Sequence, residues 1–121
     1  MNGMTLELAL KNELMTTVRL TTGGVCSLAG LGLDDSEDCK VCVTESLLLL
    51  KHRGYLSAEI RYGYEDGFEI SIEGKSVGGE KSSPAEDEIS VALLNALAQN
   101  VTMEKRNGEL CKVAFRFGTK A

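Results

Sequence analysis

The stretch VCVTESLLLLKHRGY, residues 41–55, decides the fold class of this chain. It predicts the second half of a helix that covers about 35–53, because Asp or Ser residues suited to capping precede it and Gly54 is a natural residue to follow its last turn. Four consecutive leucines cover more than one helical face, so we expect this helix to be apolar on two sides. A single carboxylate, Glu45, stands at the head of the leucine run.

Elements with other periodicities lie on both sides of this helix. Alternating and β-branched patterns predict strands at 4–10, 55–64, 67–74, 101–106 and 110–117. Helical spacing predicts two further helices at 11–30 and 85–100, the latter just after Pro84. The turn Asn107-Gly108 is typical of a type I′ hairpin. The glycine-rich residues 74–84 are expected to be a mobile surface loop.

The resulting order, β-α-α-β-β-α-β-β, predicts an α+β fold built as a two-layer sandwich. We expect a mixed, mainly antiparallel sheet covered on one face by about three helices. A length of 121 residues suits one domain, so residues 1–121 are interpreted as a single unit.

Composition excludes several classes of function. The net charge is −5, from 13 basic and 18 acidic residues. An acidic chain without a basic cluster argues against binding to nucleic acid or to an anionic membrane surface. No apolar window is long enough to span a bilayer, and the first residues lack the apolar run of a signal peptide. We therefore expect a cytoplasmic location, with all four cysteines reduced.

The element order and the stretch CVTESLLLLKHRGY together resemble the histidine-kinase-like ATPase superfamily, and within it the anti-sigma factor serine kinases of bacterial partner-switching systems. In that family the second helix carries a glutamate, then an asparagine four residues later, and ends in His-Gly-Tyr. Glu45 and Gly54-Tyr55 fall at this spacing. The resemblance implies the histidine-kinase-like ATPase fold, a catalytic role at the position of Glu45, and ATP with Mg²⁺ as cofactors.

Three departures from the family pattern predict a degenerate nucleotide pocket. Leu49 stands where the family has its Mg²⁺-binding asparagine, and Gly74 stands where it has the aspartate that binds adenine. The glycines that approach the phosphates are replaced by the acidic stretch 87–90, which would repel a triphosphate. The degenerate pocket region is therefore expected to comprise Glu45, Leu49, Arg53, Gly74 and Gly78.

These departures favour a pseudo-enzyme in which Glu45 is only a vestigial catalytic candidate, with no cofactor expected. The function expected from the resemblance is that of an anti-sigma-factor-like regulator of bacterial transcription. It would act by binding a sigma factor, an anti-sigma antagonist or another copy of itself. One alternative is an active ATP-binding serine/threonine protein kinase of the anti-sigma type. A second is a thiol redox or metal-binding module that uses Cys39 and Cys42, which a helix would place on one face.

The same residues also have purely structural interpretations. Glu45 could pair with Arg19 or Lys51, and His52 could contact the last carbonyl groups of its helix. Cys39 and Cys42 could be small core residues, as free cysteines often are.

Overall fold

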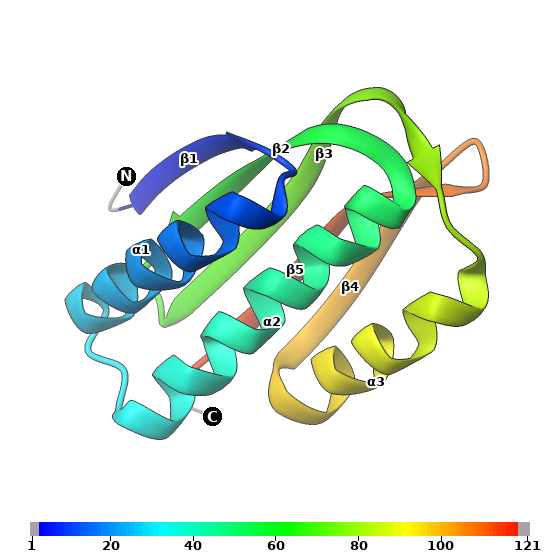
Figure 1. Ribbon diagram of the computed structural model, residues 1–121. Helices are drawn as coiled ribbons and strands as arrows, with labels where there is room; N and C mark the ends of the chain where they lie inside the picture. Colours follow the sequence, from blue (N-terminus) through cyan, green and yellow to red (C-terminus); the bar gives the residue numbers. More distant parts are fainter. Residues whose placement is uncertain (1–2, 119–121) are drawn as a thin grey trace.

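The computed structural model describes residues 3–118, which form one five-stranded sheet and one layer of three helices (Figure 1). The strands are β1 Gly3–Ala9, β2 Arg53–Gly63, β3 Phe68–Lys81, β4 Gln99–Arg106 and β5 Glu109–Phe117. The helices are α1 Met15–Leu28, α2 Leu33–His52 and α3 Glu88–Leu97, with short 3₁₀ turns at Asn12–Leu14 and Pro84–Asp87. The predicted order of elements and the α+β sandwich are confirmed.

The sheet has the order β1-β2-β3-β5-β4, and each of its neighbouring pairs is antiparallel. The expectation of a mixed sheet is therefore wrong. The reason lies in the connections. Two helices join β1 to β2 and return the chain to the end of the sheet where β1 stopped. The single helix α3 makes β3 and β4 parallel, but β5 lies between them and pairs with both.

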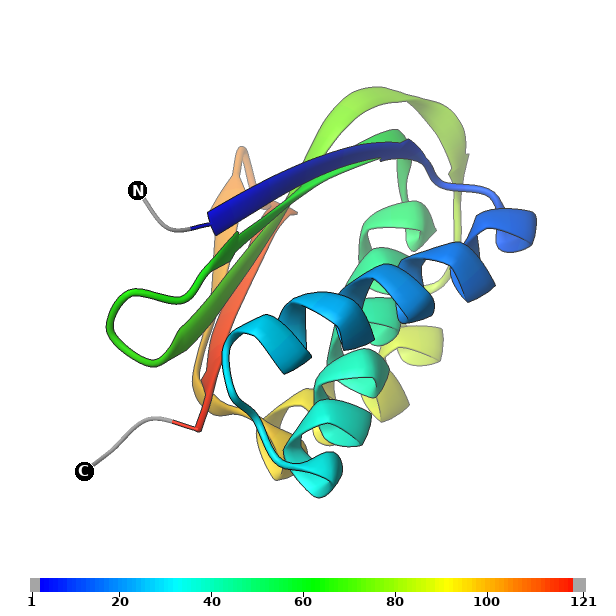
Figure 2. The same ribbon diagram turned by 90° about the vertical axis from the view of Figure 1, so that its left-hand side faces the viewer.

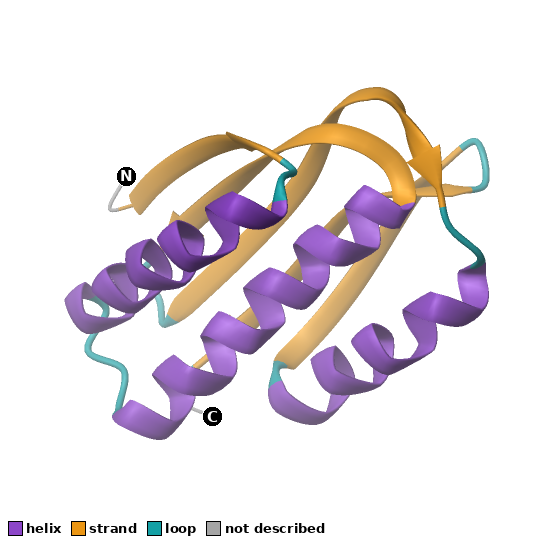
Figure 3. Ribbon diagram, viewed as in Figure 1, coloured by secondary structure: helices purple, strands orange, loops and turns teal. Residues whose placement is uncertain are grey.

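All three helices cover the same face of the sheet (Figures 2 and 3). Strand residues that point toward them, such as Ile60, Ile72 and Val113, are fully buried, while their neighbours along each strand face solvent. The central helix α2 adds Leu47 and Leu50 to this core. Because α2 packs on β2, β3 and β5 as well as on both other helices, it is apolar on more than one side, as the leucine run predicts.

Strand β3 is longer than the sequence pattern indicates. Residues 75–81 belong to it, so the expected mobile loop at 74–84 is wrong, and only Ser82–Ser83 connect the strand to the turn at Pro84. The pairing continues because the first residues of β2 bend over to meet this end of β3. Two glycines allow the contact: Gly54 has a φ of +89°, and a Cβ there would lie 3.1 Å from the carbonyl oxygen of Gly79.

The predicted turn at Asn107-Gly108 is confirmed, with φ angles of 54° and 79° that fit a type I′ hairpin. In the described part of the chain, no helix combines the length and the apolar character needed to cross a membrane.

Candidate functional site

The predicted site lies where α2 faces α3, and its first contact joins Glu45 to Ser90. The Ser90 hydroxyl donates a hydrogen bond to Glu45 Oε1 over 2.7 Å. Ser90 is buried and Glu45 is half-buried, so the carboxylate is held in a partly water-free environment by a residue of the neighbouring helix. The expected pairing of Glu45 with Arg19 or Lys51 is not what the structure has, since Lys51 instead donates to Asn12 Oδ1 over 3.0 Å.

A second contact binds the end of α2 to the start of α3 through one aspartate. Asp87 Oδ1 lies 2.8 Å from His52 Nδ1, and Asp87 Oδ2 lies 3.1 Å from Arg53 Nη2. His52 therefore pairs with a carboxylate, which is a stronger partner than the helix carbonyls expected for it. The two oxygens of Asp87 are engaged by the last residue of α2 and the first residue of β2, so this carboxylate ties the start of α3 to the junction of α2 and β2.

The Arg53 side chain is the most deeply placed charge in this contact, with 12% of its surface exposed. Its Nη2 also donates to the carbonyl oxygen of Ser82 over 2.8 Å, which ties the β3–α3 connection to the start of β2. Its Nε is buried and has no hydrogen-bond partner within the described residues. Asp87 therefore neutralises a guanidinium that water reaches poorly.

The apolar positions of the predicted pocket are filled by side chains. Leu49 belongs to the core and is only 2% exposed. The ring of Tyr55 lies against Gly74, so close that a Cβ on Gly74 would be 2.5 Å from it. Gly78 lies on the exposed end of β3, where its φ is +130° and where the preceding residue, Val77, pairs with Tyr55. The structure thus places Glu45 and Leu49 on α2 and Arg53 at the start of β2, directly after the predicted end of the helix. Gly74 lies against an aromatic ring, and Gly78 lies farther along β3.

Three residues of this region escaped prediction from sequence. Ser90 and Asp87 lie in the acidic stretch 87–90, whose charge predicts repulsion of a triphosphate but not these contacts, although serine and aspartate are common hydrogen-bonding residues at helix starts. The sequence identifies Tyr55 only as part of a family motif. The spacing of Tyr55 and Gly74 along the sequence gives no sign of their contact, because it depends on the register shift between β2 and β3.

The cysteines lie in the core rather than at a reactive surface. Cys39 and Cys42 are both fully buried. The pKa of the Cys39 thiol is raised by its hydrogen bond with Cys26 and by burial. Burial also raises the pKa of the Cys42 thiol to about 12. A reactive thiol needs a lowered pKa and access to solvent, and these two have neither. Within residues 3–118, no cluster of three or more His, Cys, Asp or Glu side chains is arranged to hold a metal ion.

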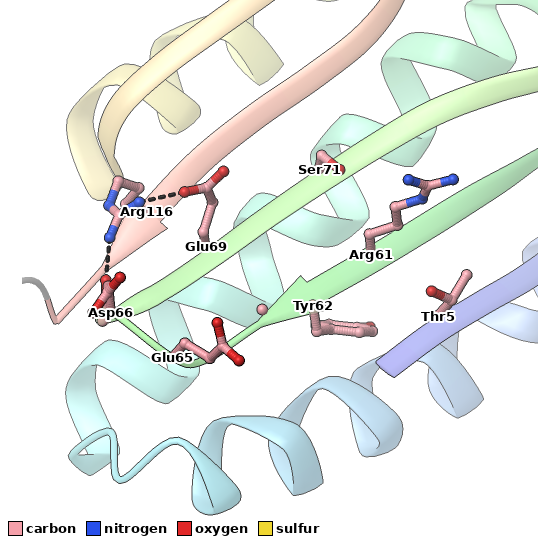
Figure 4. A pocket seen from close by; sticks show the side chains of 10 residues that line it. Thr5, Arg61, Tyr62, Glu65, Asp66, Glu69, Ser71 and Arg116 are labelled. Atoms are coloured by element: carbon pink, nitrogen blue, oxygen red, sulfur yellow. Dashed lines mark hydrogen bonds and ion pairs between the residues drawn. The ribbon is translucent and has the colours of Figure 1, made fainter. Parts of the chain in front are cut away.

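A separate hollow of about 420 Å³ lies on the face of the sheet away from the helices (Figure 4). Arg116 donates hydrogen bonds to the Glu69 carboxylate and to the Asp66 carbonyl oxygen at one end of it. Arg61, which also lines it, donates to Glu59 over 2.7 Å. Both arginines that line the hollow are paired with carboxylates, Arg61 with Glu59 and Arg116 with Glu69.

No model of a known protein family matches this sequence, and no curated protein matches it either. The resemblance to the histidine-kinase-like ATPases therefore stays a prediction that depends on the element order and on the stretch around Glu45.

Proposed function

We propose that this protein is an anti-sigma-factor-like regulator that acts by binding another protein and has a degenerate nucleotide site. The observation that carries the proposal is the contact between Tyr55 and Gly74. The resemblance gives position 74 to a carboxylate that binds adenine. A Cβ at Gly74 would lie 2.5 Å from the Tyr55 ring, so the ring in this position excludes that carboxylate.

Two further contacts support the proposal. Leu49 is buried and has no oxygen to offer Mg²⁺, which requires oxygen ligands. Asp87, in the stretch that would approach the phosphates, places a carboxylate there and holds it through His52 and Arg53. The residues present therefore do not suit Mg²⁺ or a nucleotide, and with neither bound Glu45 would have no reacting group to orient.

The two alternative functions have less support. An active kinase would need the Asp87 ion pairs and the Tyr55 ring to move before a nucleotide could enter. A thiol module would need Cys39 and Cys42 to form thiolates in the core, where burial opposes the charged form.

Titration calorimetry with ATP and ADP in the presence of Mg²⁺ tests the first half of the proposal. We expect no heat and no change in melting temperature up to about millimolar nucleotide, whereas a ligand at a hundredfold excess over its Kd would stabilise the fold by about 2.7 kcal/mol. The second half is tested by titrating purified sigma factors and anti-sigma antagonists from the source organism into the protein. Binding to one of them, unchanged by ATP, is the expected result. Nucleotide binding, or no binding to any of these proteins, would contradict the proposal.

Restoring the missing asparagine gives a sharper version of the same test. The Leu49→Asn variant should still fail to bind ATP, because Gly74 and the acidic helix start remain unsuited to a nucleotide. It should also lose about 3 kcal/mol of stability, since an amide without a partner replaces a buried leucine. Leu20→Asn, at a site 73% exposed, is the control and should leave stability nearly unchanged. Micromolar ATP affinity in Leu49→Asn would overturn the proposal.

A further inference from the structure

Helix α3 is apolar on the side that faces solvent as well as on the side that faces the core. Its sequence EISVALLNAL contains one charged residue, Glu88, yet only Ser90 and Leu94 are buried. Ile89 is 74% exposed, and Ala96 is exposed as well. Ile89, Leu93 and Ala96 are spaced four and three residues apart, so they share one stripe of the helix. A surface helix normally carries polar side chains there.

The neighbouring helix α2 extends this apolar stripe. Val41 and Leu48 lie four residues before and three residues after Glu45, so all three share one side of α2. The hydrogen bond from Ser90 to Glu45 brings that side next to α3, and the two helices run side by side in Figure 1. Val41 is exposed and Leu48 is half-buried. The α2–α3 surface is defined here by Val41, Leu48, Ile89, Leu93 and Ala96.

The rim of the α2–α3 surface is acidic. Four carboxylates flank its apolar residues: Asp38, Glu45, Glu86 and Glu88. Residues 84–97 contain no lysine or arginine, and none of Asp38, Glu86 and Glu88 pairs with a cation in the described part of the chain. The cations of α2 are occupied elsewhere: Lys40 pairs with Glu37, and Lys51 reaches Asn12.

We propose that the α2–α3 surface binds an amphipathic helix of a partner protein whose apolar stripe is flanked by lysine or arginine. An apolar stripe with helical spacing matches the stripe of a docked helix, and an acidic rim complements cations beside it. The rim also argues against a second copy of this chain, because a twofold contact would bring carboxylates of the same kind together. This inference rests on the proposed function only in that the protein acts by binding another protein.

A designed peptide serves as the probe. We would use a fluorescein-labelled amphipathic helix of about 18 leucine and lysine residues, and a control peptide with glutamate in place of each lysine. Fluorescence anisotropy should show binding of the lysine peptide only. The Ile89→Asp variant should weaken it about tenfold, because a contacted apolar side chain is lost and a carboxylate replaces it. The matched control is Val77→Asp on β3: Val77 is 73% exposed, and its variant should bind as the wild type does.

Charge reversal tests the rim separately. Glu88→Lys should weaken binding of the lysine peptide roughly threefold, and added salt should reduce the difference. The control Glu104→Lys changes the net charge equally but lies on β4, away from the helices, and should have no specific effect. Circular dichroism would establish that all four variants are folded.

The results separate this inference from the proposed function. Loss of binding confined to Ile89→Asp and Glu88→Lys supports the inference. Equal effects in the matched controls, or no binding of the lysine peptide by the wild type, would overturn it. Self-association that Ile89→Asp abolishes would identify a second copy as the occupant and would also overturn it. Nucleotide binding by the wild type, with peptide binding intact, would contradict the proposed function. It would still support the inference that the α2–α3 surface binds a helix.

Discussion

The two sides of α2 bury polar groups in different ways. On the α1 side, Thr22 and Tyr62 share a hydrogen bond of 2.8 Å, and the free thiols of Cys26 and Cys39 are hydrogen-bonded to each other. All four groups are uncharged side-chain types at their ordinary pKa values near neutral pH, and all are essentially fully buried. On the α3 side the polar groups include carboxylates. Glu45 accepts a hydrogen bond from Ser90, and Asp87 is paired with His52 and Arg53. These charged side chains keep partial contact with solvent.

The difference follows from the cost of burial. A neutral hydroxyl or thiol can be buried with one hydrogen bond, whereas a charge needs an opposite charge or access to water. The α1 side therefore resembles ordinary core, and the α3 side depends on a few specific pairs. The family resemblance implies a nucleotide site on this α3 side of α2. There the polar side chains are hydrogen-bonded or ion-paired with one another.

Of the changes considered, removal of the Asp87 carboxylate should lower the stability of the α2–α3 contact most. The Asp87→Ala variant leaves the guanidinium of Arg53 buried without an anion, so we expect a loss of about 3 kcal/mol in the free energy of unfolding, measured by urea denaturation. The double variant Asp87→Ala/Arg53→Met should recover part of that loss, because no uncompensated charge remains. A loss of less than about 1 kcal/mol in the single variant would show that the pair is effectively solvated.

Alkaline pH should instead destabilise the packing on the α1 side of α2. Burial raises the pKa of Tyr62 from 10.0 to about 12, so the folded protein favours the neutral phenol. The resulting stability is fully present below pH 10 and is lost as the pH rises through 12, at about 1.4 kcal/mol per pH unit. Urea denaturation across this range should show the decline. The Tyr62→Phe variant should decline less steeply than the wild type, and identical slopes would mean that the phenol is accessible in the fold.

Adding a methyl group to Gly74 tests the contact that closes the predicted pocket. Gly74→Ala would place its Cβ 2.5 Å from the Tyr55 ring, and we expect a loss of about 2 kcal/mol in thermal or urea unfolding. In a Tyr55→Ala background the same substitution should cost much less, because the ring is gone. An equal cost in both backgrounds would mean that the two residues are not in contact.

The smallest expected effect concerns the single hydrogen bond between α2 and α3. Ser90→Ala should cost about 1 kcal/mol, because the half-buried carboxylate of Glu45 loses its donor. Glu45→Gln keeps an acceptor for Ser90 and should cost less. If Glu45→Gln proved more damaging than Ser90→Ala, the negative charge itself would matter for a reason other than this hydrogen bond.

Local patterns predicted most of the fold. The alternation of strands, the leucine run and the turn Asn107-Gly108 report on neighbouring residues, which is why the order of elements was correct. The end of β3 was missed because glycines and serines at 74–83 resemble a loop. They are strand only because the start of β2 bends over to pair with them, and no local pattern reports a long-range pairing.

The site was harder to predict for the same reason. The sequence pointed to Glu45, Leu49 and Arg53, which lie within nine residues of one another on α2 and at the start of β2, so their spacing can be counted. Ser90, the partner of Glu45, lies 45 residues away along the chain, and Asp87 lies 35 residues from its partner His52. Only the packing of α3 on α2 reveals these contacts.

The free end of β3 has a consequence for solubility. β5 pairs with β3 only from Phe68 to Glu73, so residues 74–81 present one side without a neighbouring strand, which in many proteins invites aggregation by strand addition. Here Gly78, with its φ of +130°, interrupts the flat backbone that an incoming strand would need, and Lys75 and Lys81 add charge on either side of it. A glycine with positive φ and two lysines thus make this end of β3 a poor template for a strand of another chain.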